Sequence, residues 1–220
     1  MIKTIKNFIK SNYIWIIFFI CLVVFLTLEE DVFTHDIMEG DIIGYNLVSK
    51  YLIKTNITPI VKYITWFGSA TCLILISLLS FILKNKKISI CILSNLVIIT
   101  ILNQLLKFIF ERPRPTEYRI ITETGYSFPS GHSMVSMAFY GFIIYLIYKN
   151  INNKYIKWIL ISILSLLIIS VGISRIYLGV HYTSDVLAGF LISISYLIIY
   201  IKYTKRIIDK DSSYERQKIN

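Results

Sequence analysis

Residues 88–115 read ISICILSNLVIITILNQLLKFIFERPRP, and they carry the strongest evidence on the class of fold. The run from 88 to 110 is mostly apolar and long enough to cross a bilayer, which takes about 20 helical residues. Pro113 and Pro115 follow it, and proline cannot continue a helix. We therefore predict a membrane-spanning helix that ends at a short loop rich in arginine.

Five further segments have the same character. The chain has 220 residues, of which 55% are hydrophobic and 16% are charged. This composition excludes a disordered chain and is more apolar than that of an ordinary soluble domain. We predict one all-α domain over residues 1–220, a polytopic membrane protein with six transmembrane helices. The predicted spans are about 12–28, 63–83, 88–110, 132–148, 156–174 and 184–201.

The lysines and arginines predict the orientation of these spans. The net charge is +10, and most of the basic residues precede span one, separate spans two and three or four and five, or follow span six. Cytoplasmic loops carry such an excess of positive charge. Both termini are therefore predicted to be cytoplasmic, with 202–220 as a basic tail. Because topology accounts for the charge, we expect membrane lipids and no nucleic acid as partners.

The start of the chain allows a second interpretation. Lys3, Lys6 and Lys10 precede the first apolar run, as they do in a signal peptide. No small-residue cleavage site follows the run, which leads directly into Glu29 and Glu30. We interpret it as an uncleaved span.

The connection at 29–62 is the longest between predicted spans. Its apolar residues recur at helical spacing and give one apolar face. The segment either lies as a helix in the outer membrane interface or packs as an external helix that does not touch lipid. The residues of this face are Ile43, Leu47, Val48, Tyr51 and Leu52.

Neither His35 nor the cysteines favour a metal site. His35 lies among acidic residues, and a solvated acidic loop is a better interpretation of that stretch than an external metal site. The cysteines lie inside apolar runs, so we interpret them as core or lipid-facing residues, not as a disulfide or zinc framework. The acidic neighbours are Asp31, Asp36, Glu39 and Asp41, and the cysteines are Cys21, Cys72 and Cys91.

Polar residues cluster at the external ends of the predicted spans, where lipid makes ionisable groups costly. In the first cluster, Asn103 and Lys107 are four residues apart and share one helix face, beside Gln104. Arg114 follows on the exit loop, so Lys107 and Arg114 flank one helix end. A lone lysine at this place usually extends to the lipid headgroups. Arg112 is interpreted as such a headgroup or solvent contact.

The second cluster is Pro129-Ser130-Gly131-His132, which opens span four. The free N–H groups and positive dipole at a helix start form an anion site, and glycine lets a ligand approach the backbone. Alone, the sequence Ser-Gly-His is no more than a capped helix start.

The third cluster contains Ser174, Arg175, His181 and Asp185. Asp185 lies one helical turn after His181, so a carboxylate can orient the imidazole and make its other nitrogen more basic. The alternative is a helix-capping aspartate with a bystander histidine. Taken together, the three clusters place three cations, two histidines and one carboxylate on the same side of the membrane. This set suits phosphoryl transfer, in which cations neutralise the phosphate oxygens and a neutral histidine attacks phosphorus.

The three clusters match, in order and spacing, the three-part signature of the type 2 phosphatidic acid phosphatase (PAP2) superfamily. The motifs are Lys107-(six residues)-Arg114-Pro115, Pro129-Ser130-Gly131-His132 and Ser174-Arg175-(five residues)-His181-(three residues)-Asp185. The third motif with its flanks is similar to the bacterial membrane lipid-phosphatase branch. The match covers about 107–185, and the predicted span layout extends it to a core of about 63–201. The resemblance implies a helical bundle core like that of the vanadium haloperoxidases.

The resemblance also implies roles for the site residues and no metal or other cofactor. His181 would attack phosphorus and form a phosphohistidine, while Asp185 holds its ring. His132 would protonate the leaving group and then activate water. Tyr118, Arg119, Tyr126 and Phe128 are expected to border the site. The residues expected to bind the phosphate are Lys107, Arg114, Ser130, Gly131 and Arg175.

We therefore predict a metal-independent membrane phosphatase with its active site at the outer face. The candidate substrates are undecaprenyl diphosphate, phosphatidylglycerophosphate and phosphatidic acid. A lipid phosphotransferase of the same superfamily is the alternative with the same chemistry. A lipid or ion transporter is less favoured, because transporter sites lie near the bilayer midplane. A catalytically inactive assembly protein is disfavoured because every chemical position is filled.

Overall fold

The computed structural model describes residues 2–34, 37–82 and 85–219, with side chains described for 9–32, 37–82 and 85–209. The described residues form helices and loops without a strand, which confirms the predicted all-α class. The helices are α1 (Ile2–Thr34), α2 (Glu39–Leu52), α3 (Thr58–Trp66), α4 (Ala70–Ser80), α5 (Lys86–Phe110), α6 (Gly131–Asn150), α7 (Lys154–Tyr177) and α8 (Thr183–Ile219).

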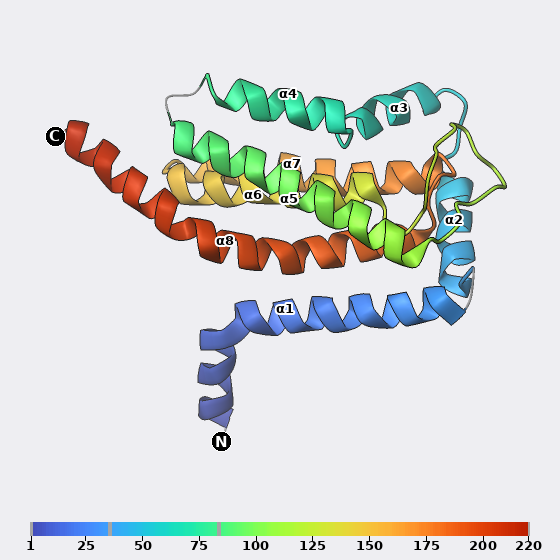
Figure 1. Ribbon diagram of the computed structural model, residues 1–220, viewed down its shortest axis with the longest axis horizontal. Coiled ribbons are helices and arrows are strands. Elements are labelled where there is room, and N and C mark those ends of the chain that lie inside the picture. Colours follow the sequence, from blue (N-terminus) through green and yellow to red (C-terminus); the bar gives the residue numbers. More distant parts are fainter. Residues whose placement is uncertain (1, 35–36, 83–84, 220) are drawn as a thin grey trace.

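Most of the helices run along one long axis, and α2 crosses one end of the bundle (Figure 1). Helix α6 is central, because it packs against α5, α7 and α8. Helix α1 packs along α8 at the edge of the bundle. The loop at 111–130 lies at the same end as α2. The ends of helices α5 and α7 and the starts of helices α6 and α8 also lie there.

Among the described residues, five helices are long and apolar enough to cross a membrane, and a sixth span results if α3 and α4 count as one. The predicted span at 63–83 is thus not one straight helix, since α3 and α4 meet at an angle of 46°. The break is stabilised by polar contacts. Ser69 caps α4 by accepting the Cys72 N–H, and the Tyr140 hydroxyl donates to the Phe67 carbonyl at 2.8 Å. Freed backbone groups inside a membrane need such partners.

Gly68 lets this break lie close to the bundle. A Cβ at position 68 would lie 2.5 Å from Val171 Cγ1 and 3.3 Å from His132 Cδ2. Both distances are shorter than ordinary van der Waals contact, so only glycine fits without a shift. The break therefore brings the chain backbone directly against α7 and the start of α6.

Helix α2 lies in the connection at 29–62. It packs against the bundle and leaves one apolar edge exposed. Val48 packs against a buried cluster that includes Tyr177, Leu178 and Val180. Ile43 and Tyr51 remain about three-fifths exposed, at 59% and 61%. A Cβ on Gly44 would lie 2.1 Å from Thr183 Oγ1, so α2 makes close contact with the start of α8. This contact fixes α2 over the end of the bundle.

Candidate active site

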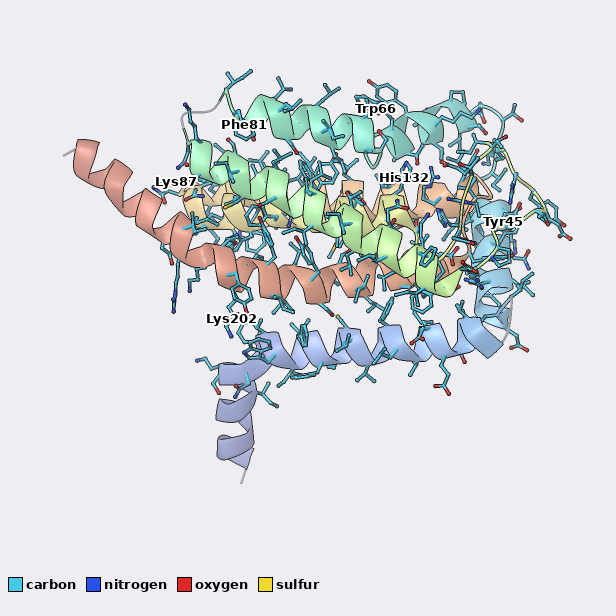
Figure 2. The ribbon with its side chains drawn as sticks, in the orientation of Figure 1. Tyr45, Trp66, Phe81, Lys87, His132 and Lys202 are labelled. Atoms are coloured by element: carbon cyan, nitrogen blue, oxygen red, sulfur yellow. The ribbon has the colours of Figure 1, made fainter. Side chains whose placement is uncertain are left out.

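A cavity of about 710 Å³ opens at the end of the bundle where the loop at 111–130 lies. It brings together residues from all three predicted clusters. Figure 2 shows His132 toward this end of the bundle, well away from Phe81 and Lys87 at the other end. The lining includes Lys107, Arg114, Glu123, His132, Arg175 and His181.

His181 and Asp185 form a buried pair at the start of α8. His181 Nδ1 lies 3.3 Å from Asp185 Oδ2, and the two residues are 3% and 0% exposed. Asp185 Oδ2 also accepts the Tyr182 N–H at 2.9 Å and the Ser127 hydroxyl. A carboxylate in this position keeps the proton on Nδ1 and leaves the lone pair on Nε2. The predicted orienting role of Asp185 agrees with this geometry.

The other nitrogen of His181 faces a guanidinium. Arg114 Nη1 lies 3.1 Å from His181 Nε2 and 3.0 Å from the Val180 carbonyl oxygen. With the proton on Nδ1, Nε2 is the acceptor and Arg114 is the donor. The nitrogen that is expected to attack phosphorus is therefore hydrogen-bonded to a cation in the free protein.

Backbone carbonyls of the loop hold the first two cations. Lys107 Nζ donates to the Tyr126 carbonyl at 2.8 Å. Arg114 donates from Nε to the Gly125 carbonyl at 2.9 Å and from Nη2 to the Thr124 carbonyl at 3.1 Å. Neutral carbonyls position these groups without neutralising their charge, which suits them to bind an anion.

Arg175 is held differently, by one neutral and one charged group. Its Nη1 donates to Thr65 Oγ1 at 2.8 Å, and its Nη2 contacts Glu123 Oε1 at 2.6 Å. Arg175 is 1% exposed, whereas the Glu123 side chain is 30% exposed at the cavity. The Glu123 carboxylate thus occupies part of the cation cluster that a phosphate would need.

Hydrogen bonds join the start of α6 to α5 and to α8. Asn103 Nδ2 on α5 donates to the Pro129 carbonyl at 3.2 Å, and the Ser130 N–H donates to the Asp185 carbonyl at 3.0 Å. Gly131 lines the cavity. Ser130 is 0% exposed and caps α6 by accepting the Ser133 N–H. Among the described lining residues Ser130 does not appear, so its predicted phosphate contact would need a rearrangement.

Arg112 is the main residue whose position was wrongly predicted from the sequence. Instead of contacting headgroups or solvent it is 3% exposed, and its Nη1 lies 2.6 Å from Asp185 Oδ1. Its Nη2 lies 2.8 Å from Asp41 Oδ2, so Asp41 is a buried ion-pair partner and not part of a solvated acidic loop. The reason is the pair of buried carboxylates that α2 and α8 bring to this loop, which compensate the charge of Arg112.

Burial and neighbouring charges shift the pKa values of the loop residues and of His181. Burial lowers the pKa of His181 to about 4, and Arg175 and Arg114 add to this effect while Asp185 opposes it. Burial also lowers the pKa of Arg114. Burial alone would lower the pKa of Arg112, but Asp185 and Asp41 outweigh it and raise that pKa. Burial alone would raise the pKa of Glu123, but Arg175 outweighs it and lowers that pKa. At neutral pH the site therefore holds a neutral His181 among charged partners.

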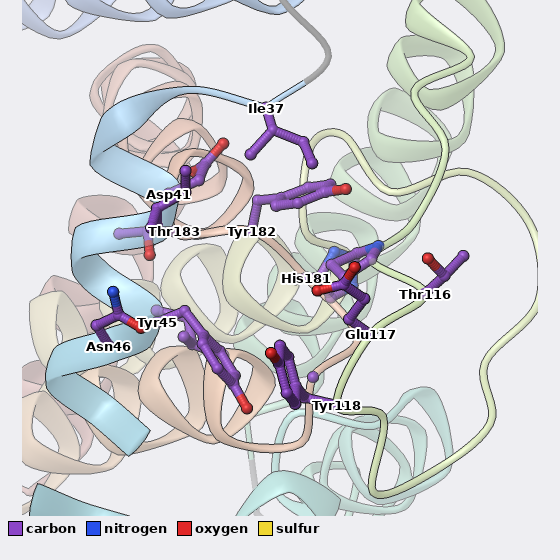
Figure 3. Close-up of a pocket in the computed structure, with 14 residues that line it drawn as sticks. Ile37, Asp41, Tyr45, Asn46, Thr116, Glu117, Tyr118, His181, Tyr182 and Thr183 are labelled. Atoms are coloured by element: carbon purple, nitrogen blue, oxygen red, sulfur yellow. The ribbon is translucent and has the colours of Figure 1, made fainter. Parts of the chain in front are cut away.

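A second cavity of about 350 Å³ reaches His181 from the side of α2. Figure 3 shows His181 deep in it, with the rings of Tyr45 and Tyr118 nearer the α2 side. These two rings stack at a centroid distance of 5.2 Å. Gly179, with φ of +67°, lets the loop cross here, since a Cβ would lie 2.4 Å from the Tyr118 carbonyl oxygen. Lys107, Arg114 and Arg175 line the larger cavity and are not among the described residues that line this one.

The remaining predicted residues have varied positions. Tyr126 lines the larger cavity, and Tyr118 lines the smaller one. Phe128 is 0% exposed and packs with Phe25 and Phe110, away from the site. Arg119 Nε donates to the Pro115 carbonyl oxygen. His35 and Asp36 lie outside the described residues. The cysteines Cys21, Cys72 and Cys91 are free and buried.

Comparison with known proteins identifies the family. Residues 88–209, more than half of the chain, match the family model described as the PAP2 superfamily. The chain belongs to the PAP2 superfamily. Phosphatidylglycerophosphatase B of Bacillus subtilis is 42% identical over 94 residues, which is 41% of this chain and 45% of that protein. Undecaprenyl-diphosphatase of Sulfolobus acidocaldarius is 29% identical over 208 residues, 89% of this chain and 94% of that protein.

A solved PAP2 structure has the same architecture. The crystal structure of the transmembrane PAP2-type phosphatidylglycerolphosphate phosphatase from Bacillus subtilis superposes with a TM-score of 0.76 at 26% identity. The superposition covers 85% of this chain and 95% of that one. These comparisons confirm the predicted family and fold class. They support a hydrolase of phosphoric monoesters or diphosphates and, more coarsely than predicted, a PAP2 membrane lipid phosphatase.

Proposed function

We propose that this PAP2 protein removes phosphate from phosphomonoester or diphosphate lipids through a phosphohistidine on His181. One observation carries the proposal: two histidines and three cations line a single cavity at the ends of membrane-spanning helices. Side-chain cations that surround the phosphate oxygens stabilise the charge of the transferring group. The cations are Lys107, Arg114 and Arg175.

The position of the cavity favours a lipid substrate over a soluble one. Its lining follows one face of α5 from Lys107 back to Thr100, roughly 10 Å at 1.5 Å per residue. Phe108 lines the cavity and is 74% exposed on the outside of the bundle. The chain of a lipid whose phosphate binds near Lys107 could therefore leave the cavity past the exposed Phe108 ring. The lipids named by the relatives, phosphatidylglycerophosphate and undecaprenyl diphosphate, fit this description, as does phosphatidic acid.

In the first chemical step, His181 Nε2 forms a bond to phosphorus while the bond from phosphorus to the leaving oxygen breaks. In this scheme His132 is protonated once the phosphate is bound, and it gives its proton to that oxygen, so the leaving group departs as a neutral alcohol or a protonated phosphate. The phosphorylated ring of His181 still carries its Nδ1 proton and is formally positive. Asp185, at 3.3 Å from Nδ1, stabilises this charge.

In the second step, water replaces the histidine at phosphorus. His132 takes a proton from the water as the oxygen bonds to phosphorus, and the electron pair of the broken N–P bond returns to His181 Nε2. Phosphate leaves, and His132 is again protonated. His132 thus acts as the acid in the first step and as the base in the second, as a two-step hydrolysis requires.

We further propose that the cavity faces the outside of the cell and that both termini are cytoplasmic. The basic residues support this orientation, because Lys87 and Lys202 lie toward the end of the bundle opposite to His132 and Tyr45 (Figure 2). Lys149 and Asp209 also form an ion pair in the part of the chain that the prediction assigns to the cytoplasmic side. We also propose that residues 1–220 form a single domain.

The proposal is tested by phosphate release from purified protein in mixed micelles with each of the three lipids. A soluble phosphomonoester serves as the comparison, and EDTA is added in a parallel series. We expect release from at least one lipid, faster than from the soluble ester and undiminished by EDTA. Mass spectrometry of the lipid product distinguishes hydrolysis from transfer to another lipid. No release from any lipid, or a strict requirement for added metal, would contradict the proposal.

A further inference from the structure

A buried chain of charges leads from the catalytic histidine to α2. His181 contacts Asp185 Oδ2, and Arg112 contacts the other oxygen, Oδ1, at 2.6 Å. Arg112 continues to Asp41 Oδ2 at 2.8 Å. Every member is at most 3% exposed, so solvent screens these interactions little. Asp41 is thus joined to the nucleophile through two intervening side chains.

Backbone and side-chain donors fix the orientation of each group in the chain. Ser184 contributes twice, because its hydroxyl accepts from Arg112 Nη1 at 2.7 Å and its N–H donates to Asp41 Oδ1 at 2.8 Å. The Arg112 guanidinium carbon lies 4.2 Å from the centroid of the Tyr182 ring. Arg112 is therefore held with its Nη1 at Asp185 and its Nη2 at Asp41.

The charges of this chain matter for the proposed reaction. Positive charge develops on the His181 ring as Nε2 bonds to phosphorus, and Asp185 stabilises it. Arg112 alone would neutralise Asp185 and weaken that support. Asp41 compensates Arg112, so the two carboxylates and one guanidinium leave one negative charge beside the histidine. Removing the Asp41 charge would leave none.

We propose that Asp41, acting through Arg112, is a positioning residue that keeps Asp185 oriented and negatively charged toward His181. This inference rests on the proposed function, since it concerns the same nucleophile. It assigns a catalytic purpose to α2, which otherwise only covers the end of the bundle. Buried ion pairs add little to stability compared with apolar packing, so stability alone does not account for this arrangement.

The test compares Asp41→Asn with Glu39→Gln. Both variants remove one negative charge from the first turn of α2, but Glu39 is exposed and Asp41 contacts Arg112. Three quantities are measured: kcat on the preferred lipid, inhibition by vanadate, and inhibition by inorganic phosphate. Vanadate bonds to the attacking nitrogen, so its affinity reports on the nucleophile. Phosphate reports only on the cation cluster.

We expect Asp41→Asn to lower kcat and vanadate affinity together by roughly tenfold, a usual loss for the partner behind an oriented histidine. Phosphate inhibition should stay within about twofold, because Lys107, Arg114 and Arg175 are untouched. Glu39→Gln should leave kcat, vanadate inhibition and phosphate inhibition within about twofold of their wild-type values. Arg112→Lys keeps the positive charge but cannot bridge both carboxylates, so it should show the same selective loss and serves if Asp41→Asn does not fold.

Two outcomes would overturn the inference. Parallel loss of vanadate and phosphate binding would show that Asp41 only maintains the local structure. Equal behaviour of Asp41→Asn and Glu39→Gln would show that the contact with Arg112 has no effect on catalysis. A wild-type protein without lipid phosphatase activity would instead overturn the proposed function, so the two failures can be told apart.

Discussion

His181 is subject to opposing influences that together set its chemistry. Burial and two nearby arginines disfavour its protonated form, while Asp185 favours it. A neutral imidazole with its proton fixed on Nδ1 is a competent nucleophile at Nε2, whereas an imidazolium has no lone pair to offer. The surroundings of His181 therefore select the neutral form of the side chain before any substrate arrives.

Replacing His181 with alanine should abolish phosphate release. Without the attacking nitrogen no phosphohistidine can form, and we expect a loss of at least about a thousandfold in kcat, as for other nucleophile deletions. The measurement is phosphate release at saturating lipid, with gel filtration in detergent to show that the variant is folded. Turnover near the wild-type rate would exclude His181 as the nucleophile.

The protonation of His181 can be followed directly. Its pKa is lowered to about 4, below the usual value near 6.5, so the folded protein resists protonation of this ring as pH falls from 7 to 5. Because the unfolded chain takes up that proton more readily, this residue contributes a loss of stability over the same interval. We expect ¹⁵N NMR of histidine-labelled protein to show the neutral Nδ1–H form of His181 at pH 5. A titration midpoint near 6.5 would contradict the burial of His181 and the nearby charges of Arg175 and Arg114.

Glu123 competes with the substrate for Arg175. In Glu123→Gln the arginine loses its ion-pair partner at the cavity, so we expect inorganic phosphate to inhibit roughly two- to fivefold more strongly, corresponding to about 0.5–1 kcal/mol for a partly exposed pair. The Tm should fall, because the buried guanidinium is left with less compensation. Competition assays and thermal unfolding of the same preparation measure the two effects. Weaker phosphate inhibition would show that Glu123 assists binding.

The residues of the site were predictable where spacing alone brings them together. His181 and Asp185 lie one turn apart, and Lys107 and Arg114 flank one helix end, so the sequence predicts their neighbourhoods. Arg112 and Asp41 were misplaced because their contact joins segments more than 70 residues apart in the chain. The repeated Arg-Pro unit is the one signal in the sequence that relates Arg112 to Arg114.

At the level of elements, helix ends place the chemistry. The end of α5 carries Lys107, and Glu111 closes that helix in the left-handed conformation with φ of 46°. The starts of α6 and α8 carry His132 and the partner of His181, and the end of α7 carries Arg175. The long apolar runs predicted these helices and their approximate ends. They did not predict the bend between α3 and α4, because the apolar run at 63–83 continues through it.

That bend can be tested at Gly68. Gly68→Ala places a Cβ 2.5 Å from Val171 Cγ1 and 3.3 Å from His132 Cδ2. We expect destabilisation of about 1–3 kcal/mol, typical of overpacking, together with a lower kcat because the His132 ring must shift. Adding Val171→Ala should relieve the closer contact and restore part of the Tm. Full activity and an unchanged Tm in the single variant would show that the break has room to spare.

At the level of the whole molecule, the distribution of charge predicts the orientation in the membrane. Tyr45 and Lys87 lie toward opposite ends of the bundle (Figure 2). In a background with Cys21, Cys72 and Cys91 replaced by serine, we expect a membrane-impermeant maleimide to label Tyr45→Cys in intact cells. Lys87→Cys should be labelled only after the membrane is opened. The reverse pattern would place the cavity on the cytoplasmic side.

The hydrogen bond between Arg114 and His181 Nε2 has a further consequence for the free enzyme. While the guanidinium occupies the lone pair, the imidazole is a poor target for small electrophiles that diffuse in from the aqueous phase. In the proposed reaction, an incoming phosphate would draw the arginine toward its own oxygens and so uncover Nε2 for the attack. Recognition of the anion and exposure of the attacking nitrogen would then be one event.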